Sequence, residues 1–244
     1  MITYGSLKEM YEEMRSVDEL VWRRLESPHW ALDGDLKAKV NEDGRFKEFV
    51  GDTVVIPLLK EDIEIMEKFQ IPFYERYEEI LAEKIDPKTF HVTIHDLSNP
   101  YNALGNLEDN ISRNERMCKE IFKEFQEFKN KSIELEVVGL VGGKVAIGLG
   151  FVPTTEEGFE LLKYLHEVFE KVVKLDYPFH PHVTLFYFKP IDPPSDLMSS
   201  FGKTLREIGE KAKGTKIRLK LSALAYQRFT DMNHYETIFS LGEI

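Results

Sequence analysis

The stretch Phe90-His91-Val92-Thr93-Ile94 decides the fold, because Pro181-His182-Val183-Thr184-Leu185 repeats its pattern 91 residues further along the chain. Upstream of both stretches, a glycine and three apolar residues follow the same offset without a gap. Gly51, Val54, Ile56 and Leu58 match Gly142, Val145, Ile147 and Leu149. Two copies, each with a strand, a helical segment and a second strand, predict two similar lobes related by a pseudo-twofold axis.

The hydrophobic periodicity places the repeat among alternating helices and strands. Helices are expected at residues 4–25, 60–84, 106–129, 155–173 and 195–212. Strands are expected at 53–59, 89–97, 132–141, 144–152 and 181–189, with a closing strand pair near 215–228 and 234–241. Turn signals within 33–52 indicate short strands joined by tight turns. The chain is therefore expected to be α/β or α+β.

Composition and charge limit the classes of function that the sequence is compatible with. The 244 residues are 42% hydrophobic and 31% charged, which is typical of a globular protein. The formal net charge is −11, whereas proteins that hold long nucleic acids by neutralising phosphates are usually basic. An extended duplex is therefore not an expected partner. A small anionic ligand in a locally polarised cleft is compatible with this charge.

Cysteine usage and hydropathy point to a soluble, cytoplasmic protein. Cys118 is the single cysteine, so no internal disulfide can form, and its helical surroundings indicate packing rather than a reactive thiol. The first residues lack the basic region and apolar run of a signal peptide. The longest mostly apolar stretch, 139–153, is short and rich in glycine, so no membrane contact is expected.

The repeated motif carries the chemistry. Side chains alternate between the two faces of a strand, so His91 and Thr93 share one face, and His182 and Thr184 share one face of the second copy. A pseudo-twofold that brings these faces together creates a cleft with two imidazoles and two hydroxyls. Histidines on opposite sides of a phosphorus atom can act as base and acid, while hydroxyls donate to its non-bridging oxygens. The alternative is a structural role, in which two buried strand histidines were preserved by duplication because they pack in the core.

These paired motifs resemble the His-hydrophobic-Thr/Ser-hydrophobic motifs of the two-histidine (2H, LigT-like) phosphoesterase superfamily, over about residues 50–241. The resemblance implies a bilobal α+β fold with antiparallel sheets around a central cleft and helices outside. It also implies metal-independent chemistry without a cofactor, typically on 2′,3′-cyclic phosphates or 2′-5′ linkages. His91 and His182 would be the catalytic acid and base, and Thr93 and Thr184 would bind phosphate. The implied partner is a nucleotide or a short RNA end.

The chain is longer than compact members of that superfamily. We expect residues 1–50 to form an N-terminal extension packed on the core, and residues 51–244 to form the bilobal domain. Trp22, His29 and Trp30 are candidates for packing this extension on a lobe or for forming a lid. The function of the extension and the oligomeric state stay open.

Two further histidines are candidates for binding substrate. His95 follows Thr93 by two residues and His180 precedes His182 by two, so regular strands would put both on the cleft faces. Several histidines in one cleft also raise the alternative of a metal-dependent enzyme. No carboxylate stands at matching spacing in both lobes, so we predict no metal site. A non-catalytic nucleotide or phosphate sensor is the other alternative.

Lys144 and Arg228 complete the substrate-binding candidates. Lys144 corresponds to Thr53 at the offset of 91 and could reach the cleft, while Arg228 could pair with a phosphate. His166 opens a His-Glu pair on a helix, without the second histidine of a zinc protease motif, and is interpreted as an ordinary helix face. The sequence leaves the substrate, and the choice between hydrolysis and ligation, undecided.

Overall fold

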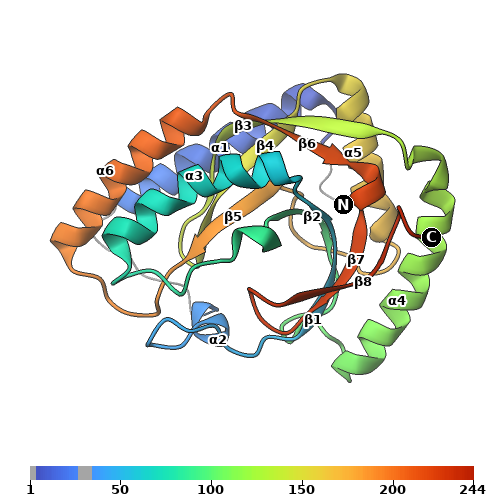
Figure 1. The fold of residues 1–244 in the computed structure, drawn as a ribbon, viewed down its shortest axis with the longest axis horizontal. Helices are drawn as coiled ribbons and strands as arrows, with labels where there is room; N and C mark the ends of the chain where they lie inside the picture. Colours follow the sequence, from blue (N-terminus) through green and yellow to red (C-terminus); the bar gives the residue numbers. More distant parts are fainter. Residues whose placement is uncertain (1–3, 27–34) are drawn as a thin grey trace.

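A computed structural model describes residues 4–26 and 35–244 of the chain (Figure 1). Its strands form two four-stranded sheets, and every neighbouring pair of strands is antiparallel. The first sheet has the order β2(His91–Asp96), β1(Gly51–Pro57), β7(Ala225–Phe229), β8(Tyr235–Ser240). The second has the order β5(His182–Tyr187), β4(Ala146–Pro153), β3(Ser132–Gly142), β6(Lys216–Lys220). The predicted α+β class and bilobal architecture are confirmed.

Helices cover the outer faces of the two sheets. They are α1(Leu7–Glu26), α2(Leu36–Lys39), α3(Lys60–Tyr77), α4(Leu107–Glu124), α5(Glu156–Phe169) and α6(Ser195–Ala212). In Figure 1, α3 and α6 lie side by side and α4 lies at the opposite edge of the molecule. Asn106 and Thr155 cap α4 and α5 by accepting hydrogen bonds from backbone N–H groups of the first turn, which fixes where both helices begin.

The two lobes exchange their helices. Strands β2 and β5, which carry the two motifs, are the edge strands of their sheets and lie beside each other. Helix α3 precedes β2 in the chain but packs against β5, while α5 precedes β5 and packs against β2 as well as against β3 and β4 of its own sheet. Each motif strand is therefore supported from behind by the helix of the other repeat.

A β-bulge occurs at the same place in both motif strands. Val54 and Val55 of β1 pair with His95 and Thr93, which leaves Ile94 as the extra residue of β2. In the second sheet the register shifts in the same way opposite Thr184 and leaves Leu185 extra. A bulge reverses the alternation of side chains beyond it. The burial patterns of β2 and β5 are identical as a result, with two successive buried residues after each threonine.

The bulges correct the alignment of the two repeats. Val55 lies opposite Thr93, and Gly148 lies opposite Thr184, so the first strands of the two repeats are equivalent at an offset of 93 residues rather than 91. The gapless alignment was wrong by two residues in this block. A shift of two keeps every side chain on the same face of a strand. The apolar pattern therefore matched equally well in the wrong register.

Two other expectations differ from the structure. The predicted strand at 215–228 is two strands, β6 and β7, which join different sheets and are separated by the 3₁₀ turn η3(Leu221–Ala223). The C-terminal segment thus crosses from one lobe to the other. Within 33–52, the described residues form the short helix α2 and one isolated bridge between Val40 and Phe46, not short strands. Leu36 and Val40 are fully buried there, so packing rather than pairing holds this segment.

Helix α1 packs on the second sheet. Met10 and Met14 are buried, and the Asp18 carboxylate accepts a hydrogen bond of 2.8 Å from the backbone N–H of Leu140. Gly139 is required at this contact, because a Cβ there would lie 2.5 Å from the Asp18 carboxyl carbon. His29 and Trp30 lie outside the described residues, and Trp22 lies within α1.

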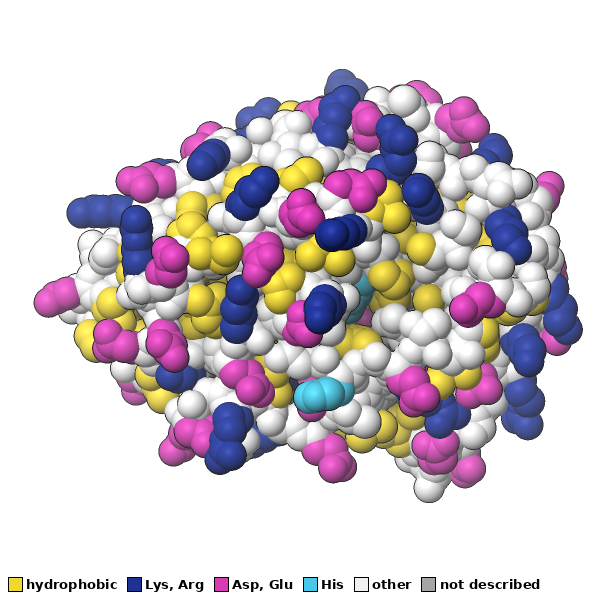
Figure 2. All heavy atoms as spheres, viewed as in Figure 1, with side chains coloured by type: hydrophobic (Ala, Val, Ile, Leu, Met, Phe, Trp, Pro, Cys, Tyr) yellow, Lys and Arg dark blue, Asp and Glu magenta, His cyan; other side chains and the backbone are white. Residues whose placement is uncertain are grey.

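Cys118 is fully buried in α4, and burial raises the pKa of its thiol, as expected for a packing residue. No helix of the described segments is both long and apolar enough to span a membrane. Acidic and basic side chains are interspersed over the face shown in Figure 2. That face lacks the basic stripe that a protein holding a long nucleic acid would present.

Candidate functional site

A cleft of about 330 Å³ lies where the two motif strands meet. His91 and Thr93 of β2 and His182 and Thr184 of β5 all line it. These four side chains are half-buried, while Val92 and Val183 between them are fully buried in the core. The strand alternation predicted from the sequence therefore brings the two polar faces to one cavity.

The two imidazoles are held in the same way. His91 Nδ1 lies 2.7 Å from the carbonyl oxygen of Thr89, and His182 Nδ1 lies 2.7 Å from that of His180. A carbonyl oxygen can only accept, so Nδ1 carries the proton in both rings, and the neutral form leaves the lone pair on Nε2. Each backbone carbonyl thus fixes one tautomer and one ring orientation.

The environment of His91 favours its neutral form. Burial lowers the pKa of the His91 imidazole, and positive charge on His182 lowers it further. The hydrogen bond to the Thr89 carbonyl and the negative charge of Asp96 act in the opposite direction and are weaker than burial. His91 is therefore poised as a proton acceptor at neutral pH.

The two threonine hydroxyls are available to a ligand. Within the described segments, neither the Thr93 nor the Thr184 hydroxyl has a hydrogen-bond partner. Both follow their histidine by two residues on the same face, before the bulge changes the alternation. A hydroxyl can donate to an anionic oxygen and rotate to meet it.

Aromatic rings and one lysine form a wall of the cleft that the sequence analysis missed. The Tyr235 ring lies 5.0 Å from the His91 ring, and Phe229 lies 5.5 Å from Tyr235. The Lys39 ammonium lies 4.9 Å from the Phe49 ring centre at the other end of the wall. The four residues come from β7, β8, α2 and the segment before β1, so no local pattern links them to the motifs.

Asp96 and Tyr187 also line the cleft because of the bulges. Each is half-buried and takes the place on the cleft face that His95 and Phe186 would occupy in regular strands. The Asp96 carboxylate accepts a hydrogen bond of 2.6 Å from the Tyr177 hydroxyl. Burial raises the pKa of the Tyr187 hydroxyl, which stays protonated and can donate.

His95 and His180 occupy different environments. The bulge at Ile94 takes His95 off the face shared by His91 and Thr93, so the predicted common face is wrong; His95 borders the cleft but is only 1% exposed. His180 lines the cleft and lies 3.7 Å from a Glu13 carboxylate oxygen of α1. Burial lowers the pKa of His180, and Glu13 partly opposes this effect.

The structure does not bring Lys144 and Arg228 to the cleft. Lys144 is exposed in the turn between β3 and β4, because the true offset of 93 pairs Thr53 with Ala146 instead. Arg228 forms ion pairs of 3.0 Å with Glu108 and 2.9 Å with Glu115 of α4. Its neighbour Phe229 faces the cleft, and alternation along β7 turns Arg228 to the other side of the sheet.

Comparisons with solved structures place this architecture among known folds. A conserved protein of unknown function, ATU0111 from Agrobacterium tumefaciens str. C58, superposes with a TM-score of 0.67 at 19% identity, over 87% of this chain and 94% of that one. TT0787 of Thermus thermophilus gives a TM-score of 0.50 at 14% identity, over 78% and 97%. E. coli LigT gives 0.45 at 12% identity, over 79% and 96%. No family model and no curated protein matches the chain.

The chain shares its fold with ATU0111 and TT0787. Two antiparallel sheets, with one His-x-Thr motif on the edge strand of each, meet at a single cleft, as the sequence resemblance implied.

A buried polar cluster behind β2 was also missed by the sequence analysis. The interpretation of His166 as an ordinary helix face is wrong, since this residue is 4% exposed and its ring lies 4.8 Å from the His95 ring. Glu170 follows α5 and places a carboxylate oxygen 4.0 Å from His166 Nε2. The amphipathic spacing of α5 was the available signal, because it puts His166 among the buried residues Leu162, Leu165 and Phe169.

Proposed function

We propose that this chain is a metal-independent phosphoesterase that acts on a phosphodiester, such as the 2′,3′-cyclic phosphate of a nucleotide or of a short RNA end. The observation that supports this most strongly is the matched pair of imidazoles. Both are tied through Nδ1 to a backbone carbonyl two residues earlier and both line one cleft.

The proposed mechanism uses one imidazole on each side of the phosphorus. Neutral His91 accepts the proton of the attacking water through Nε2, because burial lowers its pKa. His182, in its protonated form, gives a proton to the leaving oxygen. Thr93 and Thr184 donate hydrogen bonds to the non-bridging oxygens, where negative charge accumulates in the transition state. When the ester bond breaks, His91 is left protonated and His182 neutral, and one proton transfer through water then restores the starting form.

The aromatic wall supports a nucleotide as the substrate. The half-buried Tyr235 ring, beside His91, offers a surface on which a base can stack, a contact that tolerates different bases. Lys39 adds a positive charge for a second anionic group, such as the phosphate of a neighbouring nucleotide. A cleft of about 330 Å³ suits one small ligand rather than a duplex.

Turnover of 2′,3′-cyclic nucleotides and short cyclic-phosphate oligonucleotides in EDTA tests the proposal. We expect hydrolysis to continue in EDTA and to fall by about 10²–10⁴-fold in His91→Ala and in His182→Ala, the range for loss of a general acid or base. The control is His234→Ala, since His234 is an exposed turn histidine paired with Asp231. Full activity in either cleft variant would contradict the proposal. Tight nucleotide binding without turnover would indicate a sensor instead.

A further inference from the structure

The cluster behind β2 combines three side chains from both repeats. His95 comes from β2, His166 from α5, and Glu170 from the residue that follows α5. One ligand atom from each residue lies within 4.8 Å of the others. The side chains of His166 and Glu170 are 5% and 9% exposed, so solvent does not account for their polar atoms.

Backbone carbonyls fix which nitrogen of each imidazole is free. His95 Nε2 lies 2.7 Å from the Val173 carbonyl oxygen, and His166 Nδ1 lies 2.8 Å from that of Ile94. Each of these nitrogens must carry the proton, so His95 Nδ1 and His166 Nε2 hold the lone pairs of the neutral rings. A carbonyl that orients the ring through its other nitrogen is the usual support of a metal-binding histidine.

Two atoms of this cluster are buried without a hydrogen-bond partner. They are His95 Nδ1 and Glu170 Oε2, whereas Glu170 Oε1 accepts from the backbone N–H of Leu175 at 3.2 Å. Leaving a buried polar atom unpaired costs about 1–3 kcal/mol, so such atoms are rare and call for an explanation. Both unpaired atoms are acceptors that lie in one cluster, and a bound cation would satisfy both of them at once.

The other lobe shows that the fold does not require this cluster. Phe186 occupies the position of His95 at the motif offset and packs 4.7 Å from Phe73 of α3. Gln70 of α3 donates to the Leu185 carbonyl at 2.9 Å, the same contact that His166 makes with Ile94. An apolar residue and a glutamine therefore suffice for the structure. The two imidazoles behind β2 supply lone pairs that the packing does not use.

We propose that His95, His166 and Glu170 bind one divalent transition-metal ion of the zinc class. Two imidazole nitrogens and one carboxylate oxygen are ligands that Zn²⁺ prefers, and they leave a fourth position for water. His95 and His166 both border the cleft, which provides the path of entry. Ligand atoms of a tetrahedral site lie roughly 3.3 Å apart, so binding would require the three side chains, whose ligand atoms lie within 4.8 Å here, to move closer together. This site goes beyond the proposed function and does not rest on it, since the hydrolytic histidines are His91 and His182.

Metal binding by the full-length protein tests the proposal. The chain is stripped with EDTA, dialysed to remove the chelator, and titrated with Zn²⁺ and, for absorption spectra, with Co²⁺. We expect one Zn²⁺ per chain, a thermal unfolding midpoint that rises with added Zn²⁺, and the visible bands of four-coordinate Co²⁺. Stoichiometric binding should be lost in His95→Phe, His166→Gln and Glu170→Gln, with at least a hundredfold weaker affinity in each.

His95→Phe and His166→Gln introduce residues of the kind found at the equivalent positions of the other lobe, so both variants are expected to fold. His95→Phe introduces the residue found at Phe186, and His166→Gln retains a donor for the Ile94 carbonyl, as Gln70 does for Leu185. His91→Ala and His182→Ala should retain the metal. No stoichiometric Zn²⁺ in the native chain, or loss of Zn²⁺ in His91→Ala with retention in His95→Phe, overturns the proposal. Hydrolysis in EDTA is scored separately, so either proposal can fail without the other.

Discussion

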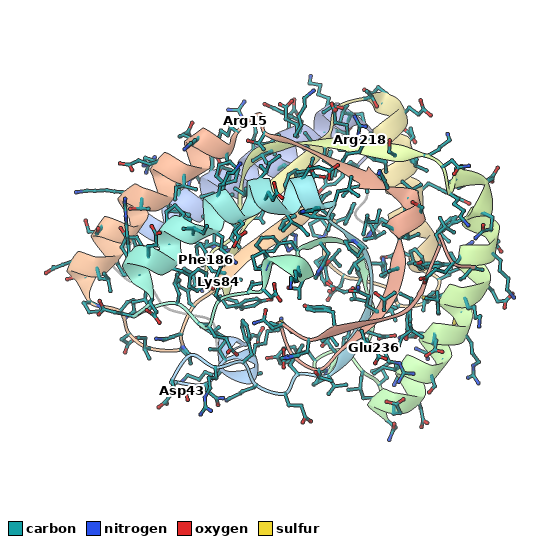
Figure 3. All side chains as sticks on the ribbon, in the orientation of Figure 1. Arg15, Asp43, Lys84, Phe186, Arg218 and Glu236 are labelled. Atoms are coloured by element: carbon teal, nitrogen blue, oxygen red, sulfur yellow. The ribbon has the colours of Figure 1, made fainter. Side chains whose placement is uncertain are left out.

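The two lobes present the same face to the cleft but differ behind it. In front, β2 and β5 carry the same histidine, threonine and bulge with identical burial patterns. Behind β2 lie His95 and His166, whereas behind β5 Phe186 packs on aromatic rings of α3 and α6. Figure 3 shows Phe186 in the interior of the molecule, in contrast to Asp43 at its periphery. The two motif strands share the histidine and threonine of the cleft face, although Asp96 on β2 takes the place of Tyr187 on β5, and the layer behind them differs.

The difference between the layers behind β2 and β5 shows which contacts the fold requires. A bulge leaves one carbonyl outside the strand ladder, and both lobes satisfy it with a side chain of the crossing helix, His166 in one and Gln70 in the other. This contact is common to both lobes and is structural. Behind β5 the buried acceptor without a partner is the amide oxygen of Gln70, whereas His95 and Glu170 belong to a group of three side chains that can ligate a metal ion, which is why we assign them a separate role.

The largest expected effect concerns the shared face. His91→Ala and His182→Ala should each reduce kcat/KM by about 10²–10⁴-fold, because each lobe supplies one partner of a proton-transfer pair. The double variant should lose little more than either single variant, since the two groups act as a unit. Steady-state kinetics on a cyclic nucleotide measures this. Losses that multiply in the double variant would mean that the two histidines act independently.

Exchanging the supporting residues tests the asymmetry. Phe186→His should lower the free energy of unfolding by about 3 kcal/mol, because it buries a polar ring among Phe73 and Phe201 without a partner. The reverse exchange, His95→Phe in the metal-free chain, should change it by less than about 1.5 kcal/mol, because it removes the unpaired Nδ1 together with the donor to the Val173 carbonyl. Urea unfolding followed by circular dichroism measures both. If the two substitutions lowered the free energy of unfolding equally, the proposed asymmetry between the two lobes would be contradicted.

The threonines should matter less than the histidines. Thr93→Val and Thr184→Val keep the shape of each side chain but remove a donor to the phosphate, so kcat should fall by about 10–10²-fold, toward the lower range for loss of one transition-state hydrogen bond. Thr93→Ser and Thr184→Ser are the matched controls and should retain most activity. An effect confined to one lobe would show that a single threonine meets the phosphate.

The smallest effect is a pH dependence of stability behind β2. Burial lowers the pKa of His95 to about 4 from 6.5, so the unfolded chain binds this proton first and acid favours unfolding. Between pH 7 and pH 5.5, the metal-free native chain should lose about 1 kcal/mol more stability than His95→Phe. Urea midpoints at the two pH values give the difference. His91 and His166, whose pKa values are also lowered, are present in both proteins and cancel. Parallel pH curves would contradict this assignment.

The sequence by itself determined the features that depend on local alternation and repetition. The offset between His91 and His182 predicted two lobes, and the period of a strand placed each threonine beside its histidine on the cleft face. Caps at Asn106 and Thr155 fixed two helix starts, because capping is a contact between neighbours in the chain. These parts of the fold and the candidate site need no knowledge of distant contacts.

Only the tertiary structure decided the rest. The bulge that buries His95 arises from pairing between strands, which alternation along one strand does not reveal. The offset of 93 in the first strands was hidden because a shift of two residues preserves the apolar pattern. The split of 215–228 between two sheets, the helix exchange and the meeting of His95 with His166 depend on which surfaces pack together. Which surfaces pack together depends on contacts between segments far apart in the chain, so the sequence of one segment does not determine them.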